Sequence, residues 1–141
     1  MRICCNCHES KILSSFRRSR NTCTKCERSK YITSNLTNWL KYILSKAKSR
    51  LKDSDISVDD LYEIYAKQDG KCFYFNIPML LPKNFKDPQS ITIDRIDNSK
   101  SYTKDNVVLA CYAANVGRNT TDYNRFKEFV DLMKENIIKC G

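Results

Sequence analysis

The chain has 141 residues, a formal net charge of +9 and a hydrophobic content of 41%. This length suits one ordinary domain or two very small ones. No apolar run approaches the ~20 residues that cross a bilayer, and the N-terminus lacks the apolar segment of a secretory signal. The composition therefore argues against a membrane protein and against a secreted one.

Positive charge is concentrated in the first third of the chain. Residues 1–52 contain 13 Lys and Arg residues but only 2 Asp and Glu residues, whereas residues 53–141 contain 12 Lys and Arg and 14 Asp and Glu. A basic segment attracts polyanions because neutralised phosphates release their counterions. We therefore expect a nucleic acid, DNA or RNA, as the partner. The alternative is a solvated basic face that keeps the protein in solution.

Four of the eight cysteines form two C-x-x-C pairs separated by 15 residues, namely Cys4, Cys7, Cys23 and Cys26. Two such pairs suit one structural Zn²⁺ bound through four thiolates. In a lysine-rich chain without a signal peptide they favour metal in a reducing intracellular compartment over disulfides. Residues 1–31 hold too few apolar side chains to build a core, so the metal would stabilise them. The adjacent Cys5 and His8 stay open as alternative ligands.

Two helices are expected in the middle of the chain. Apolar residues recur at helical spacing over 35–52, and lysines and arginines fill the other faces. We expect this helix to pack on the domain that follows, with phosphate contact as a second role. Another helix begins after Ser57, an N-cap followed by Asp59 and Asp60, and ends at Asp69-Gly70.

The second half of the chain alternates between strand, loop and helix signals. A strand is expected at 71–75, a turn at 76–78 and a loop at 82–90. Residues 91–115 then read as strand, polar loop, strand and short helix. If they form only a compact structural unit, Cys72 and Cys111 are expected to be buried small apolar residues that neighbour each other. A last helix begins at Thr121 or Asp122. Its apolar stripe is interpreted as core and consists of Tyr123, Phe126, Phe129, Val130, Met133 and Ile137.

The polar residues of this region can form a small metal site. One carboxylate, Asp94, and two side-chain amides, Asn106 and Asn115, lie within 22 residues. Oxygen ligands of this kind suit Mg²⁺ or Mn²⁺ rather than Zn²⁺. The same residue types also act as ordinary loop caps, so they could instead hold together a compact ββα unit.

Two segments resemble a known family. Residues 1–31 resemble the zinc-ribbon module that often precedes HNH nuclease domains in phage and large-virus proteins, through Cys4, Cys7, Lys11, Phe16, Cys23 and Cys26. Residues 70–119 resemble an HNH, or ββα-metal, endonuclease domain of the branch with an Asp-Arg-Ile-Asp signature. The matching residues are Gly70-Lys71-Cys72, Ile77-Pro78-Met79, Asp94-Arg95-Ile96-Asp97, Tyr102-Thr103, Asp105-Asn106-Val107 and Asn115.

The resemblance implies an α+β fold in three parts. These are a zinc ribbon at 1–31, a helical connector at 32–69, and an HNH-like ββα-metal domain with a C-terminal helix at 70–141. It further implies that Asp94 and Asn115 hold one Mg²⁺ or Mn²⁺ and that Asn106 orients the site from the loop.

Arg95 stands where the family usually has the histidine that deprotonates the attacking water. Because a guanidinium stays charged at neutral pH, Arg95 cannot act as that base, but it could hold the scissile phosphate. Asp97 is a candidate substitute base.

These observations predict a metal-dependent endonuclease that hydrolyses phosphodiester bonds. The alternative is a catalytically inactive HNH scaffold that binds DNA or RNA, for example within a ribosome or another nucleoprotein assembly. In both cases a set of cations is expected to contact phosphates. This set is Arg17, Arg18, Arg20, Lys46, Lys48, Arg50, Lys104 and Arg118.

Overall fold

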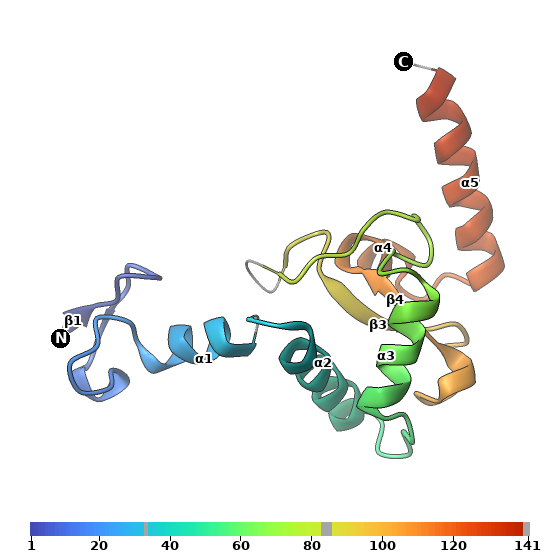
Figure 1. The fold of residues 1–141 in the computed structure, drawn as a ribbon. Helices are drawn as coiled ribbons and strands as arrows, with labels where there is room; N and C mark the ends of the chain where they lie inside the picture. The colour runs from blue at the N-terminus through green and yellow to red at the C-terminus, as the bar shows by residue number, and fades with distance from the viewer. Residues whose placement is uncertain (33, 83–85, 140–141) are drawn as a thin grey trace.

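The computed structural model describes residues 1–32, 34–82 and 86–139 and has an N-terminal module followed by a larger α+β domain (Figure 1). Its elements are β1 (Arg2–Ile3), β2 (Ser10–Lys11), the 3-10 helix η1 (Leu13–Ser15), α1 (Thr24–Ile32), α2 (Leu36–Arg50), α3 (Val58–Lys67), β3 (Ile91–Arg95), the 3-10 helix η2 (Lys104–Asn106), β4 (Val107–Cys111), α4 (Tyr112–Arg118) and α5 (Tyr123–Lys139). None of the described helices combines the length and apolar character that crossing a bilayer requires. The loop expected at 82–90 falls partly on residues 83–85, which lie outside the described residues.

The N-terminal module has very little hydrophobic interior. β1 and β2 form a short antiparallel hairpin. The buried cluster of the module consists of Cys4, Phe16 and Cys23, with Cys7 and Cys26 packed against it. Phe16 is thus the one large apolar side chain in this cluster, which agrees with the expectation that the module needs a metal to stabilise it.

Helices α2 and α3 belong to the core of the larger domain. Asn35 caps α2 by accepting a hydrogen bond from the Asn38 backbone N–H at 2.9 Å. Ser57 is the N-cap of α3, as expected, and the structure adds a capping box in which Asp60 bonds back to Ser57. The chain leaves that helix through Asp69 and Gly70, both with positive φ. The buried residues of both helices are part of one cluster with those of β3, β4 and α5. The expected connector at 32–69 therefore supplies one side of this core.

The centre of the domain is a two-stranded antiparallel sheet that pairs β3 with β4, from Ile91 opposite Cys111 to Arg95 opposite Val107. A two-stranded sheet leaves both edges unpaired, and its exposed backbone groups need other partners. On the β4 edge, Gln68 bonds the Leu109 carbonyl at 2.7 Å and the Leu109 N–H at 3.0 Å. The Cys111 N–H donates to Cys72 Sγ at 3.3 Å. Cys72 and Cys111 are accordingly buried neighbours, as expected.

The β3 edge is satisfied in the same way by three side chains from two other segments. The carbonyls of Ile91, Ile93 and Arg95 point away from β4 because alternate residues of an antiparallel strand face the same side. They accept hydrogen bonds from Trp39 Nε1 at 2.8 Å, Asn115 Nδ2 at 3.2 Å and Arg118 Nη1 at 2.6 Å, respectively. Helices α2 and α4 are thereby attached to this strand.

The prediction of a strand at 71–75 is wrong. This segment is a tight turn in which Asn76 N–H donates to the Cys72 carbonyl at 2.8 Å and Cys72 N–H donates to the Ile77 carbonyl at 2.8 Å. Asn76 has a φ of +56°, a conformation that asparagine tolerates. The aromatic residues that suggested a strand serve separate contacts, since Tyr74 is buried while Phe73 is exposed.

The apolar stripe of α5 is only half in the core. Phe126 and Val130 are buried, and Tyr123 and Met133 pack against the cluster, as expected. Phe129 and Ile137, in contrast, are 46% and 71% exposed. Figure 1 shows why, because α5 extends away from the rest of the domain towards the C-terminus.

Asp60 provides a test of how α3 is anchored. The Ser57 hydroxyl and backbone N–H, together with Lys104, lower the pKa of Asp60 to about 2. Since this folded-state pKa lies below the unfolded value, the stabilisation is present above about pH 4 and is lost as the pH falls towards 2. Asp60→Asn should therefore lower the melting temperature at pH 5 and make little difference at pH 2. Asp59→Asn, in the same helical turn but exposed, is the matched control and should show a smaller effect that does not follow this pH range.

Candidate functional site

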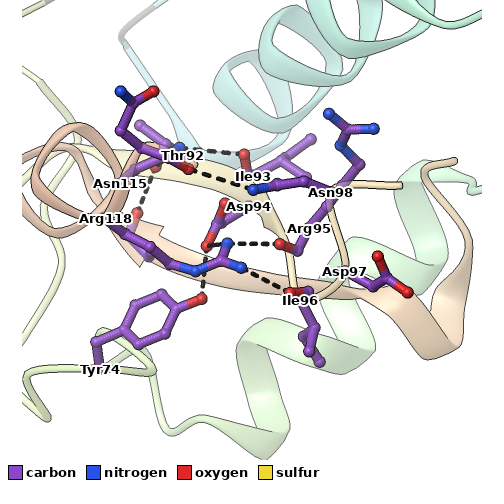
Figure 2. Close-up of polar contacts among 12 residues, drawn as sticks. Tyr74, Thr92, Ile93, Asp94, Arg95, Ile96, Asp97, Asn98, Asn115 and Arg118 are labelled. Carbon is purple, nitrogen blue, oxygen red and sulfur yellow. Dashed lines mark hydrogen bonds and ion pairs between the residues drawn. The ribbon is translucent and has the colours of Figure 1, made fainter. Parts of the chain in front are cut away.

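Asp94 lies at the centre of a buried ion pair. The residue is 6% exposed, and both described hydrogen bonds of its carboxylate go to Oδ2, from Arg118 Nη1 at 2.7 Å and from the Tyr74 hydroxyl at 2.5 Å (Figure 2). Burial and the hydrogen bond to Asp94 raise the pKa of Tyr74 well above its ordinary value, so the hydroxyl stays protonated and donates. The second oxygen, Oδ1, is left for another partner.

Arg118 is held in place on several sides. It is 1% exposed, and beyond Asp94 it donates to the carbonyls of Arg95 and Ile96 at 2.6 Å each. Its guanidinium carbon lies 5.9 Å from the centroid of the Tyr74 ring. Its Nε is buried and has no hydrogen-bond partner among the described residues. The surface phosphate contact expected of Arg118 is therefore not available in this conformation, because the guanidinium lies inside the domain.

Asn115 lies on the same face of β3 as Asp94. Its Nδ2 is 2.9 Å from Thr92 Oγ1 and 3.2 Å from the Ile93 carbonyl, and Thr92 and Asp94 share a strand face because they are two residues apart. A carbonyl can only accept, so this contact fixes the amide with its nitrogen towards the strand. The amide oxygen is then available, and Asp94 and Asn115 together offer two hard oxygen donors.

Asp94 and Asn115 both line a groove of about 980 Å³ between α2 on one side and β3 with α4 on the other. Asp94 is the one carboxylate among the described residues that line it. Three cations line it as well, namely Lys46 and Arg50 from α2 and Arg95 from β3. The groove therefore combines a strongly basic wall with two oxygen donors.

Arg95 occupies the rim of this groove and lies away from Arg118 (Figure 2). Its Nη1 donates to the Lys100 carbonyl at 2.8 Å, and its guanidinium carbon lies 5.1 Å from the centroid of the Tyr102 ring. These contacts hold the side chain while leaving other N–H groups of the fork to bind an anion.

Asp97 and Asn106 organise the loop rather than the groove. Asp97 Oδ1 accepts from the N–H and hydroxyl of Ser99 at 2.9 and 2.6 Å, and these bonds lower the pKa of Asp97. Its carboxylate points away from Asp94 (Figure 2) and is not among the groove residues, which gives no support to Asp97 as a base. Asn106 is buried and bonds the N–H and carbonyl of Asp97 and the Ser101 carbonyl.

The remaining cations of the expected phosphate-binding set differ in their surroundings. Arg17, Arg18, Arg20, Lys46, Lys48 and Arg50 are all exposed. Lys48 is not among the groove residues, whereas Lys46 and Arg50, one helical turn apart, both are. Lys104 is already paired with Asp60 and Glu63, at 3.2 and 2.6 Å.

The four expected cysteines converge into a second site in the N-terminal module. The sulfurs of Cys4, Cys7, Cys23 and Cys26 all lie within 4.8 Å of one another. This approaches the ~3.8 Å edges of a tetrahedron of thiolates with metal–sulfur bonds of ~2.3 Å, and the cluster can hold a metal ion. The backbone N–H of Cys23 donates to Cys4 Sγ at 3.3 Å and is the largest cause of a lowered pKa for Cys4, whereas burial raises the pKa of the Cys26 thiol. A metal ion would have to displace the proton from such a thiol, because a metal binds the thiolate.

Comparison with known proteins identifies a shared fold. No protein-family model and no curated protein matches the sequence. Among solved structures, the rare-cutting HNH restriction endonuclease PacI matches with a TM-score of 0.54 at 17% sequence identity, over 96% of this chain and 95% of PacI. The chain thus has an α+β, HNH-like fold preceded by a cysteine module.

Sequence reasoning missed the partners of Asp94. The sequence pattern places Tyr74 in a strand and Arg118 among the surface cations. A signal existed for Arg118, since it lies one helical turn after Asn115 and so shares its helix face. No local pattern signals Tyr74, because 20 residues separate it from Asp94.

The cysteine cluster predicts one metal ion per chain. Cys7→Ser and Cys26→Ser should each abolish binding, because a site that loses one of four thiolates loses most of its affinity. Elemental analysis of the purified protein after dialysis measures this. Cys5→Ser is the matched control, since Cys5 is exposed and contacts Thr22 at 3.2 Å rather than the cluster. Equal loss of metal from Cys5→Ser would show that the ligand assignment is incorrect.

Proposed function

We propose that the protein is a metal-dependent endonuclease that binds DNA in the groove between α2 and α4 and hydrolyses a phosphodiester bond there. The observation that carries this proposal is the placement of Asp94 Oδ2 against Arg118 while Asn115 is fixed on the same strand face. Both residues line a basic groove, and none of the described hydrogen bonds uses Asp94 Oδ1 or the Asn115 amide oxygen. The likeness to a restriction endonuclease described as perturbing DNA supports DNA over RNA.

The donor set fits Mg²⁺ or Mn²⁺. Asp94 and Asn115 would hold the ion through one carboxylate oxygen and one amide oxygen, the hard ligands that these ions prefer. Such an ion supplies charge stabilisation for the phosphate and for the leaving oxygen. Two protein ligands also leave coordination positions for water and phosphate.

The chain's own cations would hold the nucleic acid around this point. Arg95, fixed by Lys100 and Tyr102, presents a guanidinium that can bind a phosphate through two N–H groups. Lys46 and Arg50 would bind the backbone from the opposite wall. The exposed arginines of the N-terminal module, Arg17, Arg18 and Arg20, would add affinity without sequence preference. Zn²⁺ is the ion we propose for the cysteine cluster, because four thiolates leave no open position and suit a structural role.

A nicking assay tests the enzyme directly. The wild-type chain should nick supercoiled plasmid in Mg²⁺ or Mn²⁺. Asp94→Asn should reduce the rate by about 100-fold or more, since loss of a residue that only supports a metal ligand already costs about 10- to 100-fold. Asparagine keeps an acceptor for Arg118 and Tyr74, so the fold is disturbed less than by alanine. Asp97→Asn is the control and should nick nearly as well as the wild type.

A second candidate is a nucleic-acid-binding protein that keeps this fold without catalysis. The observation in its favour is Arg95, a group that cannot accept a proton, at the position of the usual base. This second candidate predicts salt-sensitive binding of nucleic acid with no nicking of plasmid and no cleavage of structured RNA, even at high protein concentration. Cleavage that Asp94→Asn lacks would exclude it.

The groove itself can be tested by salt-dependent binding. Lys46→Gln and Arg50→Gln should each weaken DNA binding and reduce the slope of log affinity against log salt by about 1, the change for one lost phosphate contact. Lys48→Gln removes the same charge from the same helix but outside the groove, so its slope should change less. Fluorescence anisotropy at several salt concentrations provides the measurement. Equal slopes for all three variants would contradict the groove as the binding surface.

A further inference from the structure

The two oxygens of Asp94 have different roles in this fold. Oδ2 accepts from Arg118 and from Tyr74, at 2.7 and 2.5 Å, whereas no described hydrogen bond uses Oδ1 of this groove-lining residue. A metal ion would therefore meet a carboxylate whose position and orientation are already set. Arg118 and Tyr74 act through Asp94 and are positioning residues.

Arg118 also removes most of the charge that would attract an ion. The ion pair is almost fully buried, with side-chain exposures of 1% for Arg118 and 7% for Asp94. Charges in such surroundings are weakly screened, so the guanidinium offsets the carboxylate effectively. Its bonds to two backbone carbonyls hold it there, so it does not readily move aside.

The other side chains of the groove make it still less favourable for a cation. Lys46, Arg50 and Arg95 line it, and Asp94 is the one acid among its described lining residues. With Asp94 neutralised by Arg118, a divalent cation that enters alone approaches a positively charged wall. A nucleic-acid phosphate in the same groove supplies the missing negative charge and can contribute an oxygen ligand to the ion.

We propose that the ion and the nucleic acid bind cooperatively at this site, because Arg118 lowers the affinity of Asp94 for a divalent cation until a phosphate is present. This inference rests on the proposed function. The coupling is reciprocal: the ion raises the affinity for nucleic acid by the same factor as the nucleic acid raises the affinity for the ion. The protein alone would then hold Mg²⁺ or Mn²⁺ weakly, and would assemble its metal site on the substrate.

The experiment measures Mn²⁺ binding by electron paramagnetic resonance of the free ion, with the full-length chain alone and with the chain saturated by a short mixed-sequence DNA duplex. The same titration with Asp94→Asn corrects for Mn²⁺ taken up by the DNA. We expect DNA to raise the Mn²⁺ affinity by about tenfold or more, within the usual range of coupling factors. Anisotropy with and without Mn²⁺ should give the same factor for DNA.

Variants at Arg118 distinguish the effect of its charge on Mn²⁺ affinity from a purely structural role of the side chain. Arg118→Gln should raise the Mn²⁺ affinity of the DNA-free chain and reduce the coupling factor, whereas Arg118→Lys keeps the positive charge and should keep the coupling. Tyr74→Phe removes a hydrogen bond without changing charge, so it should also keep the coupling. A merely structural role for Arg118 would lower Mn²⁺ affinity in both Arg118 variants, and that result would overturn the proposal.

The coupling factor of the wild-type chain tests the proposal even if circular dichroism shows that Arg118→Gln fails to fold. A coupling factor below about twofold, against the usual range of about five or more, overturns the proposal. If such a protein still nicks plasmid, the endonuclease assignment stands and only the coupling is lost. If Mn²⁺ binds neither the free chain nor the DNA complex and no nicking occurs, the proposed function fails as well.

Discussion

The unpaired edge of β3 is the constraint on which the larger domain depends. A two-stranded sheet is marginal in water, and an edge left without partners costs free energy or invites pairing with another chain. Here the carbonyls of Ile91, Ile93 and Arg95 are each bonded by a side chain from α2 or α4. These bonds fix both helices against the sheet and define the groove between them.

The same contacts build the candidate site, so fold and site are not separable in this domain. Asn115 and Arg118 both satisfy the edge and both lie against Asp94 or its strand neighbour Thr92. A buried ion pair is not by itself a source of stability, because desolvation of the two charges offsets their attraction. The Asp94–Arg118 pair is better understood as a means of holding a carboxylate in one orientation beneath a basic groove.

Much of this organisation could be predicted from the sequence because it depends on local signals. Helical periodicity together with the Ser57 N-cap predicted α2 and α3, and the order of polar and apolar residues over 91–115 predicted β3, β4 and α4. The two C-x-x-C pairs predicted the cysteine cluster, since each pair is a local turn and four thiols need little else to converge. The placement of Asp94 and Asn115 near each other followed from the resemblance to HNH domains.

Tertiary structure decided the features that depend on partners distant in sequence. The segment 71–75 became a turn because Cys72 and Tyr74 are drawn to separate partners on β4 and β3. Arg118 is a buried partner of Asp94 rather than a surface cation, since the unpaired β3 carbonyls offered it acceptors. Residue types and spacing thus determined which chemical groups were available, whereas the assignment of each group to surface, loop or ion pair arose from packing between segments far apart in the chain.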